Sequence, residues 1–128
     1  MRTIDYKGTA KITIIRANAI VATRRSVLAF RGSAQDEEAE EAIRVLRTIT
    51  YPDLTSPVSK AEGFVELEDG SRISLDTWPI SFENFCLIPD GLLLEWETAV
   101  YAENPHWSPL AAATDEEQEK KIEKSTDA

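Results

Sequence analysis

A two-residue turn, Asp69-Gly70, constrains the fold more than any other local feature of the chain. Apolar residues flank it on both sides: Phe64, Val65, Leu67, Ile73 and Leu75. Glycine readily adopts the positive φ that a tight hairpin turn requires. The pattern therefore predicts a β-hairpin centred on residues 69 and 70.

The N-terminal residues alternate with a period of two around Lys7-Gly8. The apolar positions are Ile4, Tyr6, Ala10, Ile12 and Ile14. This alternation predicts a short N-terminal hairpin, and a helix that begins near residue 12 is the alternative. Residues 16–31 are rich in alanine and large apolar residues and contain neither proline nor glycine before Gly32. They predict a helix that ends at Gly32.

A second helix is predicted over residues 33–50. Ser33 is followed three positions later by Asp36, which approximates a capping box. The apolar positions recur at helical spacing: Ala39, Ala42, Ile43, Leu46 and Ile49. Tyr51-Pro52 should end this helix, because the residue before a proline disfavours the helical conformation. Residues 51–63 contain two prolines and predict an ordered loop or a broken short helix.

Two helices are predicted in the last third of the chain. Ser81 can cap a short helix that places Phe82, Phe85 and Cys86 on one face, with Cys86 as a small core residue. A longer helix over residues 91–103 has an apolar side that includes Leu92, Trp96, Ala99 and Val100. Asn104 can end it in the left-handed conformation, and Pro105 prevents its continuation.

These elements predict a mainly α-helical (α+β) protein with one folded domain over residues 1–110. The domain is expected to carry a small hairpin at Asp69-Gly70 and a short N-terminal hairpin. Residues 111–128 are acidic and contain one large apolar residue, Ile122. We expect this tail to be disordered or a frayed helix in isolation, because it can bury little apolar surface.

Charge divides the chain into a basic head and an acidic body. The net charge is −9, yet residues 1–31 carry seven basic side chains and one acidic side chain. Head and body should attract each other, within one chain or between chains. The head could also contact an acidic partner or nucleic acid, or simply be a solvated face. Without interleaved aromatic residues it is a weak signal for nucleic-acid binding, and we expect no nucleic-acid partner.

The sequence offers little recognisable catalytic chemistry. The single histidine, His106, has no cysteine or carboxylate at metal-ligand spacing, and no glycine-rich phosphate loop is present. We therefore expect no enzymatic activity, no metal and no cofactor. No apolar run approaches the roughly 20 residues of a membrane-spanning helix. The N-terminus lacks the apolar segment of a secretion signal, so we expect a cytoplasmic protein without a membrane partner.

The stretch LIPDGLLLEWETAVYAENPHWSP, residues 87–109, resembles the C-terminal signature of tail assembly chaperones from long-tailed bacteriophages and prophages. The matching residues are Phe82, Phe85, Pro89, Leu93, Trp96, Val100, Asn104, Pro105 and Trp107. The pieces YPDL, residues 51–54, and AEG, residues 61–63, are also similar to that group. The resemblance covers about the C-terminal half of the chain.

The resemblance implies a non-catalytic assembly factor that binds the tape-measure protein and aids tail-tube assembly. Its expected partners are therefore the tape-measure and tail-tube proteins, and a homo-oligomer stays open. Trp96, Val100, Tyr101 and Trp107 are the candidate protein-binding residues, since tryptophan is enriched at interface hot spots. The alternative places both tryptophans in the core, around the end of the helix. Two other functions stay open: a small nucleic-acid-associated or regulatory protein that uses the basic head, and a minor virion connector protein.

Overall fold

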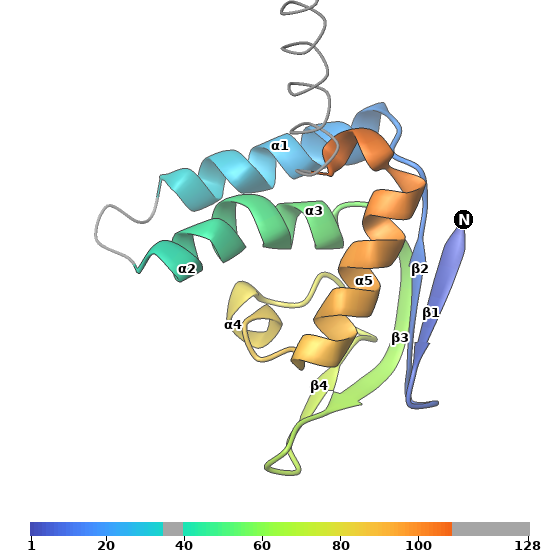
Figure 1. Ribbon diagram of the computed structural model, residues 1–128. Helices are drawn as coiled ribbons and strands as arrows, with labels where there is room; N and C mark the ends of the chain where they lie inside the picture. Colours follow the sequence, from blue (N-terminus) through green and yellow to red (C-terminus); the bar gives the residue numbers. More distant parts are fainter. Residues whose placement is uncertain (35–39, 109–128) are drawn as a thin grey trace, which may run out of the picture.

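The computed structural model describes residues 1–34 and 40–108 and shows an α+β fold. A four-stranded antiparallel sheet has the strand order β1-β2-β3-β4, and the helices lie on one side of it (Figure 1). The strands are β1 (Arg2–Tyr6), β2 (Ala10–Ile14), β3 (Val58–Glu66) and β4 (Arg72–Ser74). The prediction of a mainly helical domain is therefore wrong, because the sheet supplies one whole layer of the core.

Both predicted hairpins are confirmed. In the first, Lys7 and Gly8 have φ values of 53° and 73°, and Ile4 pairs with Ile12. In the second, Gly70 has a φ of 85° and Val65 pairs with Ile73. The alternative of a helix from about residue 12 is wrong, because residues 10–14 form β2.

The pairing of β2 with β3 joins the two hairpins into one sheet, and the sequence did not predict it. Ile12 pairs with Ala61 and Ala10 with Gly63. Gly63 has a φ of 89°, and a Cβ at this position would overlap the carbonyl oxygen of Thr9. Residues 58–63 were expected in an ordered loop or a broken short helix, yet they form the first two thirds of the longest strand.

The helical elements are α1 (Ala19–Ser33), α2 (Glu41–Val45), the π-helical turn η1 (Leu46–Thr50), α3 (Tyr51–Thr55), α4 (Phe82–Phe85), α5 (Asp90–Glu103) and the 3-10 turn η2 (Pro105–Trp107). Helix α1 begins after Asn18, whose side chain accepts a hydrogen bond from the backbone N–H of Val21 at 3.0 Å. The predicted helix over residues 16–31 is confirmed, shifted by two or three residues.

Two predictions around the end of α1 are wrong. Gly32 lies inside the helix and is buried, and a Cβ there would stand 2.6 Å from the carbonyl oxygen of Arg47. Its small size lets α1 approach η1 closely. Ser33 does not cap the next helix, because it belongs to α1 and its hydroxyl donates to the Phe30 carbonyl at 2.9 Å. Asp36 and Ala39 lie outside the described residues.

Pro52 does not end the second helical segment as predicted. The chain passes through η1, where the backbone N–H of Tyr51 bonds to the Leu46 carbonyl, and continues into α3. Proline in a regular helix lacks a donor and clashes with the carbonyl four residues earlier. The wider π turn before Pro52 changes that spacing, so the helical path continues to Thr55.

The core lies between the sheet and α3, α4 and α5. Its fully buried large side chains include Ile12, Ile14, Leu54, Val65, Leu75, Leu92, Trp96 and Val100. The Phe85 ring meets Trp96 edge-on, with 5.6 Å between centroids. The predicted Ser81 cap of α4 is confirmed, since its hydroxyl accepts from the Asn84 N–H at 3.1 Å. Cys86 is exposed, so its expected place in the core is wrong.

Candidate partner-binding surface

Three of the four candidate binding residues, Trp96, Val100 and Trp107, are in the core. Trp96 is fully buried on α5, and its indole N–H donates to the Leu54 carbonyl oxygen at 3.0 Å. Val100 lies one turn later and is also fully buried. Trp107, in η2, is 7% exposed and belongs to the same core. A binding role for these three residues stays a prediction, and the folded chain does not expose them.

Two of the candidates, Tyr101 and Trp107, lie beside a buried carboxylate. Asp53 on α3 is 2% exposed. It accepts one hydrogen bond from the Tyr101 hydroxyl at 2.8 Å and another from Arg25 Nε at 2.6 Å. The Arg25 guanidinium also stacks over the Trp107 ring, 4.3 Å from its centroid. This cluster ties α1, α3, α5 and η2 together.

The cluster has a clear electrostatic signature. Burial, followed by the negative charge of Asp53 and the hydrogen bond to it, raises the pKa of the Tyr101 hydroxyl well above its ordinary value of 10.0. A phenolate at this position would face a carboxylate with little water to separate the two charges. Tyr101 is therefore held as a hydrogen-bond donor, which suits a structural role.

A different surface, on α1, is apolar and open. Val21 and Gly32 are the buried residues of this helix. Ile20, Val27 and Phe30 are exposed, at 66%, 41% and 74% of their surface. An open groove of about 570 Å³ runs along the helix, and we call it the α1 groove. It is lined by Ala19, Ile20, Thr23, Arg24, Val27, Leu28 and Arg31.

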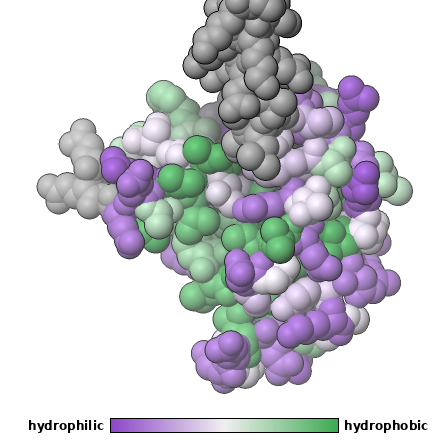
Figure 2. Space-filling view, in the orientation of Figure 1, coloured by the Kyte–Doolittle hydropathy of each residue, from purple (hydrophilic) through white to green (hydrophobic). Residues whose placement is uncertain are grey.

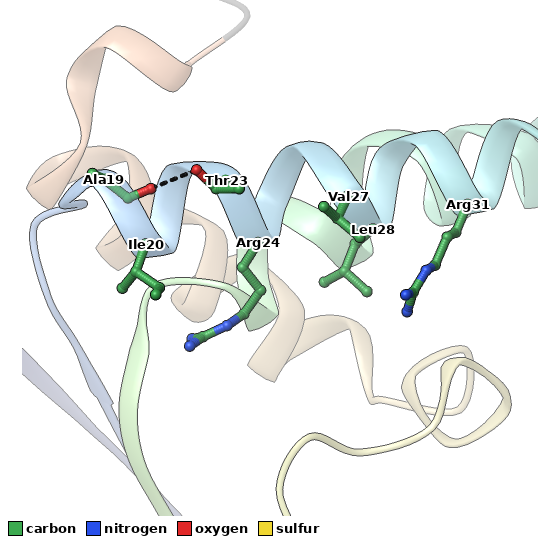
Figure 3. A pocket seen from close by; sticks show the side chains of 7 residues that line it. All are labelled: Ala19, Ile20, Thr23, Arg24, Val27, Leu28 and Arg31. Atoms are coloured by element: carbon green, nitrogen blue, oxygen red, sulfur yellow. Dashed lines mark hydrogen bonds between the residues drawn. The ribbon is translucent and has the colours of Figure 1, made fainter.

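Figure 3 shows how these side chains lie. Ile20, Arg24, Leu28 and Arg31 project from the same side of α1, at spacings of three or four residues. Arg24 and Leu28 also line a neighbouring cavity of about 380 Å³, together with Thr55, Trp78 and Pro79. The α1 groove thus extends past the helix toward the segment that precedes α4.

The ion pairs show how the basic head is used. Arg25 pairs with Asp53, and both Arg2 and the N-terminal ammonium pair with Glu103 at 3.2 Å. The basic head and the acidic body therefore attract each other within one chain. This was one of the two arrangements expected from the charge division, and attraction between chains was the other. Arg24 and Arg31 form no ion pair with a carboxylate in residues 1–34 or 40–108. Arg24 donates one hydrogen bond, to the Ser56 carbonyl at 3.4 Å.

Apolar surface is not confined to α1. On the face drawn in Figure 2, hydrophobic residues gather between α2 and α4, while the tip of the β3–β4 hairpin is hydrophilic. The segment 41–50 exposes Val45 and Ile49, and Leu87 is exposed just after α4. What sets the α1 groove apart is the combination of exposed apolar side chains with two arginines that lack a carboxylate partner among the described residues.

The described part of the chain contains no cluster of three or more metal-ligating side chains. None of its helices is long and apolar enough to cross a membrane.

No known protein family, curated protein or solved structure matches the chain. The sequence pattern did not predict the α1 groove. Ile20, Val27 and Phe30 lie at helical spacing, but such spacing does not show which side of a helix is buried.

Proposed function

We propose that the protein is a non-catalytic tail assembly chaperone, which holds a helical segment of the tape-measure protein and aids tail-tube assembly. The resemblance of residues 87–109 suggests the class of protein. The observation that carries the proposal is the exposed apolar row of α1 along an open groove. An amphipathic helix that lays its apolar side into a groove is a common mode of recognition.

The exposed apolar side chains of α1 can contribute to reversible binding. Full burial of a large apolar side chain contributes about 1.5–3 kcal/mol. Ile20, Val27 and Phe30 are each between 41% and 74% exposed, so a partner can still bury a large part of each. Part of this gain is offset by the lost freedom of two molecules. A chaperone must release its client during assembly, and weak binding through a few side chains is compatible with release.

Co-purification tests the proposal directly. The tagged chain is co-expressed with a candidate tape-measure protein, which a chaperone of this class should have encoded beside it, and the retained fraction is measured. The double variant Ile20→Ser/Val27→Ser, at two exposed apolar residues that line the groove, should lose most of the retained protein while its melting temperature stays within a few degrees of wild type. Leu94→Ser is the matched control, because Leu94 is 65% exposed on α5 and does not line the α1 groove.

The same preparation separates the alternatives. If wild type retains no tail protein but binds DNA, with an affinity that falls steeply as salt is raised, the nucleic-acid alternative replaces the proposal. If wild type is recovered as part of finished particles, it is a virion component instead. If both variants retain the tail protein equally, the α1 groove is not the binding surface.

A further inference from the structure

We infer that the α1 groove selects an amphipathic helix with two acidic residues seven positions apart beside its apolar stripe. The inference deepens the proposed function, because it specifies which segments of a tape-measure protein the groove would hold. Its basis is the spacing of Arg24 and Arg31 and their position among the apolar side chains of α1.

The two arginines form a repeat along one side of the helix. They are seven residues apart, so they lie about 10 Å apart along the axis and point in nearly the same direction. Both line the groove together with Ile20, Val27 and Leu28. A partner helix that packs along α1 would present its own side chains at the same seven-residue spacing.

Neither guanidinium group is neutralised by a described carboxylate, and Arg24 makes one long hydrogen bond, to the Ser56 carbonyl at 3.4 Å. Arg24 and Arg31 are exposed, and neither pairs with a carboxylate in the described part of the chain. The adjacent Arg25 shows the contrast, since its guanidinium is bound to the buried Asp53 carboxylate at 2.6 Å. Guanidinium groups bind carboxylates well through paired hydrogen bonds. The charge of the groove therefore favours an acidic occupant.

Other occupants fit less well. A second copy that docked α1 against α1 would bring four arginines together, two from each chain, at an apolar contact. Residues 109–128 of this chain are acidic, but they contain only two large apolar residues, Leu110 and Ile122. Two such residues, twelve positions apart, cannot cover the row formed by Ile20, Val27 and Phe30. A separate acidic, amphipathic helix matches both the charge and the apolar row.

Synthetic peptides test the inference without a natural partner. Three labelled peptides of six helical turns have the same apolar stripe. Apart from the two varied residues, they also have the same amino-acid composition. The first has Glu at two flanking positions seven apart, the second has the same two Glu residues on the opposite face, and the third has Lys at the flanking positions. Fluorescence anisotropy with the full-length chain measures the three affinities. The first peptide should bind about tenfold more tightly than the third, with the second between them.

A charge swap gives the decisive result. The variant Arg24→Glu/Arg31→Glu should reverse the order, so that the Lys peptide binds more tightly than the first peptide. Lys11→Glu/Lys60→Glu is the control, since it makes the same total change of charge at two exposed lysines, on β2 and β3, that do not line the α1 groove. This control should keep the wild-type order. Circular dichroism confirms that the variants are folded, and the gain of affinity for the Lys peptide cannot arise from unfolding.

Three outcomes overturn the inference. The first is equal binding of the three peptides, or a charge swap without a change of order. The second is a wild-type dimer that Ile20→Ser dissociates, which assigns the groove to a second copy. The third is tighter peptide binding by the full-length variant Ile122→Ser, which assigns the groove to the chain's own tail.

The peptide experiment and the co-purification experiment can fail separately, so a failure of the inference is distinguishable from a failure of the proposed function. If the tape-measure protein co-purifies but the peptide order is flat, the proposed function stands and the inference fails. If the peptides show the predicted order but no tail protein co-purifies, the groove has this specificity and its natural partner is a different acidic helix.

Discussion

The Asn104 side-chain oxygen accepts a hydrogen bond from the backbone N–H of Ala17 over 2.7 Å, across 87 positions of sequence. The amide nitrogen of the same side chain donates to the Ile15 carbonyl at 3.1 Å and to the Val100 carbonyl at 3.2 Å. Asn104 is fully buried. One side chain thus fastens the end of α5 to the connection between β2 and α1.

Asn104→Ala should lower the free energy of unfolding by about 2–3 kcal/mol, because it leaves the N–H of Ala17 and the carbonyl of Ile15 buried without this partner. Urea denaturation followed by tryptophan fluorescence measures the effect. Asn84→Ala is the control, since Asn84 is exposed on α4, and it should change stability by less than about 0.5 kcal/mol. An equal loss in the two variants would show that the Asn104 network contributes little.

Arg24 and Arg25 are neighbours in sequence, but we expect the replacement of Arg25 to affect stability and the replacement of Arg24 to affect peptide binding. Arg25→Ala should lower the free energy of unfolding by roughly 2 kcal/mol, because the buried Asp53 carboxylate loses its cation; the partial exposure of Arg25 moderates the cost. Arg24→Ala should leave stability nearly unchanged and should weaken binding of the acidic peptide. Thermal melts and anisotropy on both variants check this division. Similar melting temperatures would contradict it.

The stability conferred by Tyr101 should depend on pH in the alkaline range. Its pKa is raised above 10.0 in the folded chain, so the unfolded chain releases this proton first as the pH rises. The contribution is therefore fully present below pH 10 and declines as the pH increases beyond it. Tyr101→Phe removes this titration and, at neutral pH, a hydrogen bond to a charged group worth about 1.5–3 kcal/mol.

The measurement is the difference in unfolding free energy between wild type and Tyr101→Phe at a series of pH values. The difference should narrow above pH 10. The Tyr51 hydroxyl also has a raised pKa, mainly through burial, but it is present in both proteins and cancels in the difference. A difference that stays constant or widens would show that the Tyr101 hydroxyl is not held beside the Asp53 carboxylate.

Two glycines in helices should respond in opposite directions to alanine. Gly32→Ala should destabilise the protein by about 1–3 kcal/mol, since the new methyl group would stand 2.6 Å from the backbone oxygen of Arg47. Gly91→Ala meets no atom within 4 Å near the start of α5. It should be neutral or stabilise by up to about 0.5 kcal/mol, because alanine favours the helix. Chemical denaturation of both variants checks the sign of each effect.

The local parts of the fold could be predicted from the sequence. Lys7-Gly8 and Asp69-Gly70 mark hairpins because positive φ values at a turn depend on the turn residues themselves. Asn104-Pro105 marks the end of α5 for a similar reason. The conformation predicted for Asn104 is nevertheless wrong, since its φ is −129°. Two of its side-chain partners, Ile15 and Ala17, lie far away in the sequence, and no local pattern reveals a contact over that separation.

The sheet and the candidate surface depend on packing between distant segments. In β3, the buried residues Val58 and Val65 are seven positions apart, so a period of two is not visible. Its pairing with β2 connects residues more than 40 positions apart. On α1, the apolar row reads like a core stripe in sequence. The structure packs Val21 and Gly32 inward instead and leaves Ile20 and Phe30 in solvent.

The π turn at Leu46–Thr50 also acts as a rotational spacer. A π turn contains about one residue more than an α turn, and each residue of an α-helix rotates the side-chain direction by about 100°. The extra residue therefore sets the phase of α2 relative to α3. With this phase, Arg47 lies against Gly32 and stacks on the Phe82 ring at 4.5 Å, while Tyr51 packs against the same ring. A one-codon deletion within this turn would yield a more regular helix in a less stable protein, because Arg47 would rotate away from both contacts.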